Sequence, residues 1–167
     1  NPGAPSWPYP GSAEPARVMR ASSPAVSDAT VIAPFATGEL SAAVRTATLI
    51  GRGLPEPGGD DAAFDEGVRL ALADPAVTAH LFSVRVRQLS GCLDPQGASD
   101  FLSGLLLGAE IAAAPAEQAE SIAIVGGERL AARYARGLAL AGFTSVRVVA
   151  GEAAAARGLY RIWSMMK

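Results

Sequence analysis

Residues 121–143 read SIAIVGGERLAARYARGLALAGF, and this stretch decides the fold class. The apolar run at 121–125 predicts a short strand, and Gly126 and Gly127 follow it directly. From 128 to 141 the apolar side chains return at helical spacing. The stretch therefore predicts a strand that runs through a glycine pair into a helix.

The glycine pair has two explanations at this stage. A strand that turns directly into a helix presents free backbone N–H groups and the positive end of the helix dipole, a combination that binds anionic ligands. A tight turn, however, needs small residues whether or not a ligand binds there. The residues alone leave both explanations open.

A second strand and a last helix complete the unit. Residues 144–150, TSVRVVA, predict a strand, and 151–167 predict a helix by their propensity. This β-α-β-α order implies two parallel strands joined by a right-handed crossover, with ligands expected at the carboxyl ends of the strands. Gly126 and Gly127 occupy that edge. We therefore expect an α/β fold that is helix-rich and has a short parallel strand pair.

Helices are expected before this unit. The first is expected at 37–50. The second is capped by Asp60 or Asp61 and ends before Pro75, and the third is expected at 79–91. The fourth begins with Asp94 as its N-cap residue and Pro95 at its first position. The third segment is ambiguous, because residues 84–87 alternate like a strand while Phe82, Val86 and Leu89 have helical spacing; we favour helix. On the fourth helix, the small residues Ser103, Gly104 and Gly108 let another element pack closely.

Composition excludes several classes of function. Half of the 167 residues are apolar, enough for a sizeable core, and the net charge is −2 without a basic stripe, so no nucleic-acid partner is expected. The apolar stretch at 101–109 ends at Glu110, short of the ~18 residues that cross a membrane. Cys92 is the single cysteine, and the start of the chain has no secretory signal, so we expect a cytoplasmic protein.

Residues 1–30 differ from the remainder of the chain. They are rich in proline, which favours extended backbone, and we interpret them as a leader or linker that precedes one domain at 31–167. The chain begins at Asn1 without an initiator methionine. This start indicates either processing or a piece of a longer protein.

Common catalytic motifs are missing from the sequence. It has no Gly-Lys-Ser/Thr phosphate loop, no three-glycine dinucleotide fingerprint and no nucleophile elbow. His80 and Cys92 alone do not make a metal site. The acid pairs at 60–61 and 65–66 could serve acid–base chemistry, but solvated acids near a helix start explain them better. Arg85 and Arg87 are two residues apart, so they would point to the same side, and could bind one anion together, only on a strand. The alternative is that both are solvated or paired with other side chains of the protein.

Six phrases resemble one family in order and spacing. They are FATGELSAAVRTATLIGR (35–52), AFDEGVRLAL (63–72), HLFSVRVRQLSGCL (80–93), SDFLSGLLLGAEI (99–111), IAIVGGERLAARYARGLALAGF (122–143) and AAARGLYRI (154–162). Together they are similar to the C-terminal half of 2-keto-3-deoxygalactonate kinases (2-dehydro-3-deoxygalactonokinases), enzymes of galactonate catabolism. The resemblance covers the chain from about Val31 to its end.

The resemblance implies a fold and a reaction. Such kinases resemble the actin and hexokinase superfamily, in which two α/β lobes hold ATP and substrate between them. They use ATP and Mg²⁺ to phosphorylate the 6-hydroxyl of the sugar acid. Carried onto this chain, Gly126 and Gly127 would lie against the adenosine. Thr37 and Gly38 would lie near the cleft, unless Thr37 is a helix cap, and Arg85 and Arg87 match a family phrase without an assigned contact.

Two family motifs are missing from these 167 residues, and each belongs to a phosphate loop. Neither the Asp-x-Gly-Thr loop nor the Gly-Thr-His-Ser-Lys-Trp phrase occurs, and no aspartate stands out as the catalytic base. Phosphoryl transfer depends on positioning and on cationic charge. We therefore expect the nucleotide-side lobe of a sugar-acid kinase, inactive alone and in need of its N-terminal lobe. The alternatives are a non-catalytic nucleotide-binding or protein-interaction module and, less well supported, a dinucleotide-binding domain.

Overall fold

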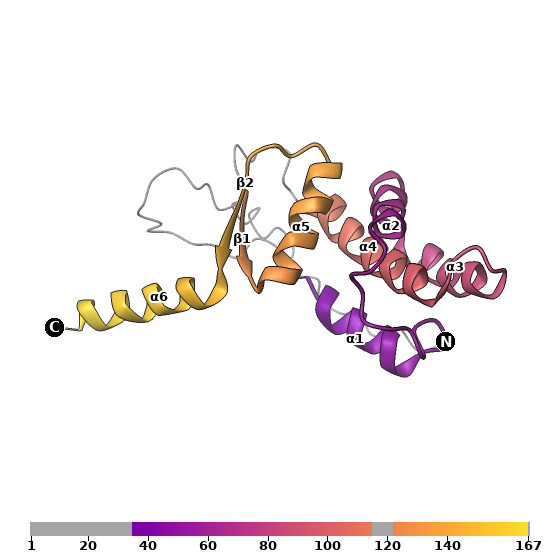
Figure 1. Ribbon diagram of the computed structural model, residues 1–167. Coiled ribbons are helices and arrows are strands. Elements are labelled where there is room, and N and C mark those ends of the chain that lie inside the picture. The colour runs from indigo at the N-terminus through magenta and orange to yellow at the C-terminus, as the bar shows by residue number, and fades with distance from the viewer. Residues whose placement is uncertain (1–34, 115–121, 167) are drawn as a thin grey trace, which may run out of the picture.

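The computed structural model describes residues 35–114 and 122–166, so the proposed leader at 1–30 lies outside the described residues. The elements in chain order are α1 (Thr37–Ala47), α2 (Asp61–Ala73), α3 (Val77–Leu89), α4 (Pro95–Ala113), β1 (Ile122–Gly126), α5 (Glu128–Leu140), β2 (Val146–Ala150) and α6 (Gly151–Met165). Figure 1 shows the helices α1–α4 gathered at one side of the strands, with α5 between. The predicted helix-rich α/β architecture is confirmed for these residues.

Side-chain caps fix where two of the helices begin. An Asp60 carboxylate oxygen accepts a hydrogen bond of 2.9 Å from the Ala63 N–H at the start of α2. An Asp94 carboxylate oxygen accepts one of 2.6 Å from the Gly97 N–H, and Pro95 takes the first position of α4. Both arrangements satisfy a backbone donor that the helix itself cannot pair, as the sequence predicts.

The ambiguous segment is helical. Val84 is buried, and Val77 and Leu81 pack against the same cluster, so a face of α3 at helical spacing enters the core. Phe82, Val86 and Leu89, whose spacing favoured the helix, lie on another face and are exposed. The first helix is shorter than expected, because Thr48 has an extended backbone and α1 ends at Ala47 rather than at Ile50.

Helix α4 lies at the centre of the fold and is buried along most of its length. It crosses α2 at very short range through facing glycines. A Cβ atom added to Gly104 would lie 2.1 Å from the Phe64 carbonyl oxygen, and one added to Gly67 would lie 2.3 Å from that of Phe101. The backbones therefore touch directly, which confirms that the small residues of α4 permit close packing.

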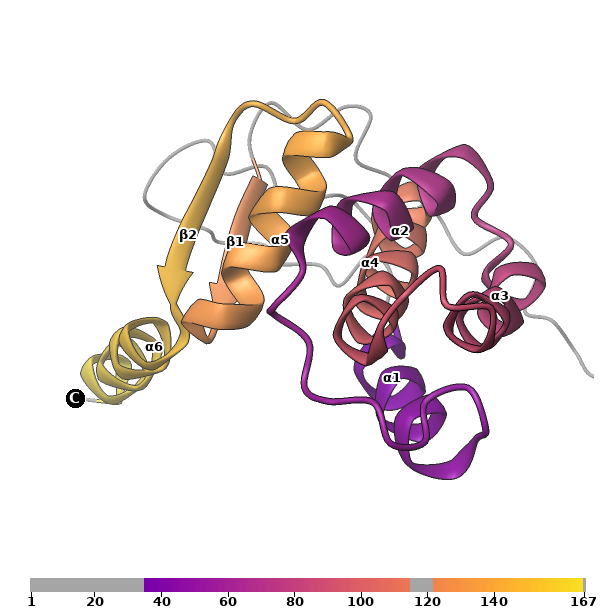
Figure 2. The ribbon, with the colours of Figure 1, turned by 45° about the vertical axis from the view of Figure 1, so that its right-hand side comes forward.

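The two strands pair in parallel, from Ile122 opposite Val146 to Gly126 opposite Ala150. Helix α5 connects them and packs between the strand pair and α4, an arrangement that Figure 2 shows clearly. The apolar strand side chains Ile122, Ile124 and Val146 join a core cluster with α2, α4 and α5. The parallel pair and its helical connection are thus as the sequence predicts.

Helix α6 leaves the end of β2 and projects away from the other helices (Figure 1). It has no buried residue. Within residues 35–114 and 122–166, none of the helices combines the length and the apolar character that crossing a bilayer takes.

Candidate functional site

The glycine pair forms an open corner between β1 and α5. Gly126 ends the strand, and Gly127 occupies the N-cap position with φ −69° and ψ 149°. Neither glycine has a positive φ, and a Cβ atom added to either would meet no atom within 4 Å. Any residue could adopt this backbone and fit this space, so no neighbour among the described residues requires glycine at either position.

The first turn of α5 is exposed at the same corner. No side chain caps this helix, and its first residues, from Gly127 to Leu130, are exposed to solvent. The free N–H groups of the turn and the positive end of the helix dipole therefore face outward. Such an end attracts an anionic group.

The loop that joins α1 to α2 runs beside this end of α5. Arg129 on the first turn donates to the Glu56 carboxylate at 3.1 Å, and the Gln96 amide donates to the Glu56 carbonyl oxygen at 3.1 Å. The pair Arg129–Glu56 is exposed and contributes little stability by itself. A second and stronger attachment lies one helical turn further along α5.

That attachment is centred on Asp100, a fully buried carboxylate on α4. Its oxygens accept hydrogen bonds from three successive loop N–H groups, those of Gly58 (2.6 Å), Gly59 (3.0 Å) and Asp60 (2.8 Å). The Gln96 amide donates at 2.8 Å and the Arg133 guanidinium of α5 at 2.5 Å. A buried charge is stable only when it is paired and hydrogen-bonded, and Asp100 meets both conditions.

Burial by itself opposes the ionisation of Asp100, but the hydrogen bonds from Gln96, the Asp60 N–H and Arg133 outweigh it. Together they hold the pKa of that carboxyl below its usual value. The Arg133 guanidinium also lies over the Phe64 ring, 4.2 Å from its centroid. Asp100 therefore stays ionised and joins α4, the loop and α5.

Arg45 of α1 holds the other end of the loop. Its guanidinium donates to the Pro55 carbonyl oxygen at 3.2 Å and to the Ser99 hydroxyl and carbonyl oxygens at 3.0 Å and 3.1 Å. Burial lowers the pKa of Arg45, with Glu56 and Asp100 acting in the opposite direction. Residues 55–60 are thus fixed on three sides next to the glycine corner.

The structure does not bring the other predicted site residues to this corner. Thr37 and Gly38 begin α1, where Ala36 is the N-cap residue and makes no side-chain capping bond, so capping does not explain Thr37. Arg85 and Arg87 lie on α3, at the far side of the fold from β1 in Figure 1. Their roles near a cleft stay predictions.

The two arginines have protein partners. Arg85 donates to the Gln88 side chain at 2.7 Å, whereas Arg87 pairs with Glu66 and lies 4.6 Å from the centroid of the Phe101 ring. Because α3 is a helix, the two side chains point in different directions, and the geometry for clamping one anion does not arise.

The paired carboxylates have structural roles. Asp60 caps α2, and Asp61 and Asp65 both pair with Arg136 of α5. The Arg136 hydrogen bond to Asp65 outweighs the opposing effect of burial and lowers the pKa of this carboxyl. Among the described residues, no three His, Cys, Asp or Glu side chains group as a metal site.

Asp100 and Arg133 are the residues that sequence reasoning missed. A signal was available, since Asp100 is a charged residue in an apolar, glycine-containing helix. Such a residue must find buried partners. The spacing of residues in the sequence, however, does not identify the loop N–H groups that donate hydrogen bonds to Asp100.

Comparisons with known proteins place the chain in a family. The model of the 2-keto-3-deoxy-galactonokinase family matches residues 25–162. The chain is 38% identical over 128 residues to the 2-dehydro-3-deoxygalactonokinase of Escherichia coli (strain K12). The matched segment covers 75% of this chain and 44% of that protein. It is also similar to a crystal structure assigned as a 2-dehydro-3-deoxygalactonokinase protein from Sinorhizobium meliloti, with TM-score 0.63, 30% identity, and 78% of this chain and 46% of the other covered.

The chain thus spans less than half the length of both relatives. The family match covers most of its residues, including the glycine corner and the Asp100 cluster. This chain belongs to the 2-keto-3-deoxy-galactonokinase family.

Proposed function

We propose that residues 31–167 are the nucleotide-side lobe of a sugar-acid kinase with an actin- and hexokinase-like fold. The complete enzyme would act in the cytoplasm, in galactonate catabolism, and transfer the γ-phosphate of ATP to the 6-hydroxyl of 2-keto-3-deoxygalactonate. The proposal rests on one observation, the open corner at Gly126 and Gly127. Neither glycine has a described neighbour in front of it, so the bare main chain there is open to a ligand.

The corner has the chemistry that a purine nucleoside needs. Bare main chain at Gly126 and Gly127 lets a flat base approach closely, and the exposed start of α5 forms one wall. The positive end of this helix favours the phosphate chain. The loop with Glu56, held by Asp100, lies beside this end of α5, and Arg129 of the first turn pairs with the Glu56 carboxylate.

Magnesium enters only through the family resemblance. Among the described residues, no three His, Cys, Asp or Glu side chains gather as ligands for it. The family's two phosphate-loop motifs do not occur in this sequence. The chain alone is therefore expected to bind nucleotide but not to turn over 2-keto-3-deoxygalactonate.

Calorimetric titration of ATP into the chain tests the nucleotide site. Saturable heat is expected, and Gly127→Trp should abolish it because the indole fills the space of the base. Gly158→Trp is the matched control, since this glycine on α6 also has no atom within 4 Å of an added Cβ. Equal binding by the wild type and Gly127→Trp would contradict the proposed site.

A coupled assay of ADP release tests the catalytic claim. The chain alone should give no turnover above the blank with 2-keto-3-deoxygalactonate and MgATP. Robust turnover by the isolated chain would refute the argument from the missing phosphate loops.

A second candidate is a non-catalytic module that associates with another protein. The exposed apolar face of α6 favours it, since such surfaces mark interaction sites. The ATP titration separates the two candidates, because a module that lost its site gives no saturable heat and Gly127→Trp then changes nothing.

A further inference from the structure

The start of α5 lacks the apolar packing that fixes the remainder of this helix. Its buried residues are Ala131, Gly137 and Leu138, whereas residues 127–130 are all exposed. The position of the first turn therefore depends on polar contacts. Because this turn is one wall of the proposed nucleotide site, a contact that fixes the turn also fixes the site.

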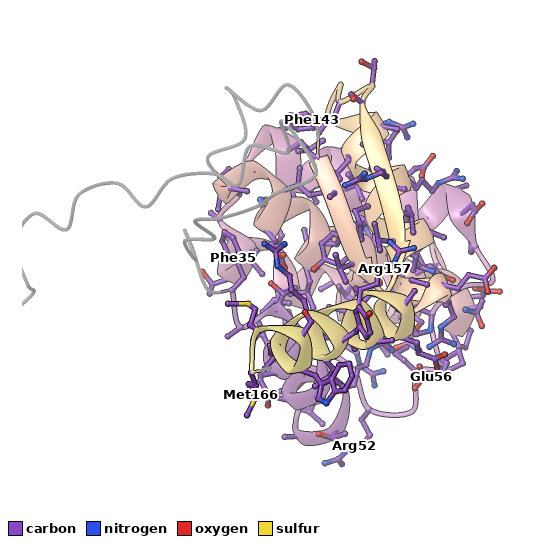
Figure 3. The ribbon with its side chains drawn as sticks, turned by 90° about the vertical axis from the view of Figure 1, so that its left-hand side faces the viewer. Phe35, Arg52, Glu56, Phe143, Arg157 and Met166 are labelled. Atoms are coloured by element: carbon purple, nitrogen blue, oxygen red, sulfur yellow. The ribbon has the colours of Figure 1, made fainter. Side chains whose placement is uncertain are left out.

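Polar contacts join this part of α5 to the loop at 55–60. The Arg129–Glu56 pair is mostly exposed and holds the turn only weakly. Figure 3 shows Glu56 toward the same end of the molecule as α6, which begins directly after β2. One turn further along α5, Arg133 pairs with Asp100, and these side chains are only 12% and 0% exposed. Since water screens a buried pair much less, the Arg133–Asp100 pair is the stronger of the two connections.

The two carboxylate oxygens of Asp100 have different sets of partners. Oδ2 accepts three hydrogen bonds, from the N–H groups of Gly59 (3.0 Å) and Asp60 (2.8 Å) and from the Gln96 amide (2.8 Å). Oδ1 accepts one from the Gly58 N–H at 2.6 Å and one from the Arg133 guanidinium at 2.5 Å. One oxygen therefore binds the loop and α4, and the other connects the loop to α5.

We propose that Asp100 is a positioning residue of the nucleotide site. It holds the loop at 55–60 and the first half of α5 in one arrangement, so that the exposed start of α5 has a fixed place beside the glycine corner. Asp100 is fully buried and acts through Arg133, without touching the ligand. The inference rests on the proposed function, since it gives Asp100 a part in nucleotide binding. A site that has the right arrangement only part of the time binds more weakly in proportion to that fraction.

Asp100→Asn tests the proposal, because it has the same shape and separates the roles of the two oxygens. The amide oxygen can replace Oδ2 and keep the partners of that atom. The NH₂ group then faces Arg133 and the Gly58 N–H, which are donors as well, so the connection to α5 is lost. Calorimetric titration should show the Kd for ATP rising about tenfold, as for a binding-competent fraction of about one in ten. Without nucleotide, hydrogen exchange should become faster at 127–133 and stay slow at 59–60.

Val84→Ala is the matched control for stability. Val84 is fully buried on α3, at the far side of the fold from β1 in Figure 1, so its truncation destabilises the core away from the site. The Kd for ATP should not change, because a lower stability leaves the affinity of the folded chain as it was. Circular dichroism shows whether each variant folds. If Asp100→Asn does not, Gln96→Ala replaces it; this change removes the bonds to Asp100 and to the Glu56 carbonyl and should raise the Kd about threefold.

The outcomes separate this inference from the nucleotide site itself. If the wild type gives saturable heat with ATP and the folded Asp100 or Gln96 variant binds equally well, the positioning role is overturned and the site stands. The same conclusion follows if Val84→Ala weakens binding as much, or if exchange at 127–133 does not change in Asp100→Asn. If the wild type gives no saturable heat, the nucleotide site and the positioning role are both overturned.

Discussion

Replacement of Asp100 by alanine should destabilise the chain more than any surface change. The substitution removes a fully buried carboxylate that accepts five hydrogen bonds, one each from Gly58, Gly59, Asp60, Gln96 and Arg133. The Arg133 side chain, which is only 12% exposed, would lose its ion-pair partner. Three loop amides would lose the group that fixes them.

The size of the loss in unfolding free energy depends on which of these groups can be hydrated after the substitution. Removal of one partner from a buried ion pair costs about 3–5 kcal/mol, because the other charge stays buried. The orphaned amides would add about 1–3 kcal/mol each if they stayed dry. Gly58 and Gly59 are exposed, however, so their N–H groups can bind water once the loop is released. We therefore expect a loss of about 3–5 kcal/mol in total.

Urea unfolding followed by circular dichroism at neutral pH measures this loss. Asp94→Ala is the matched control, because Asp94 is an exposed aspartate of the same helix that accepts one capping hydrogen bond, a contribution of about 1 kcal/mol. A double-mutant cycle with Arg133→Met should show a coupling energy well above about 0.5 kcal/mol. The reasoning is refuted if Asp100→Ala costs no more than Asp94→Ala, or if the two replacements are additive.

Three more predictions concern single residues. The pKa of Asp100 is lowered in the folded state, so its contribution to stability is complete above the unfolded pKa of about 4 and disappears as the pH falls through the folded pKa. On acidification, Asp100→Asn should therefore lose less free energy of unfolding than the wild type. Gly104→Ala should lower the free energy of unfolding by about 3 kcal/mol, since its Cβ would meet the Phe64 carbonyl at 2.1 Å, while Gly126→Ala should change it by less than about 0.5 kcal/mol. Burial and Glu110, which accepts its hydrogen bond at 2.9 Å, raise the pKa of Tyr134. Ultraviolet titration of the wild type and of Tyr134→Phe should therefore give the same change in absorbance near pH 10, because the Tyr134 phenol does not ionise there.

Much of the fold could be predicted from local patterns in the sequence. Asp60 and Asp94 precede their helices in the arrangement that caps require, and the glycine pair lies between a strand and a helix as expected. These features depend on interactions over a few residues, which periodicity and capping chemistry describe directly. The segment around Arg85 was harder, because its apolar residues fit two periods; packing of Val84 into the core favours the helix.

The tertiary structure alone decided which residues hold the loop at 55–60 against α4 and α5. Asp100 meets the Gly58 N–H across 42 positions of sequence and Arg133 across 33, and no local pattern encodes such a pairing. The tertiary structure also distinguishes glycines that look alike in the sequence. Gly104 leaves no room for a side chain because the α2 backbone touches it, whereas Gly126 and Gly127 have open space in front of them. The sequence determines local conformation through neighbouring residues, whereas a site depends on which distant surfaces the buried core brings together.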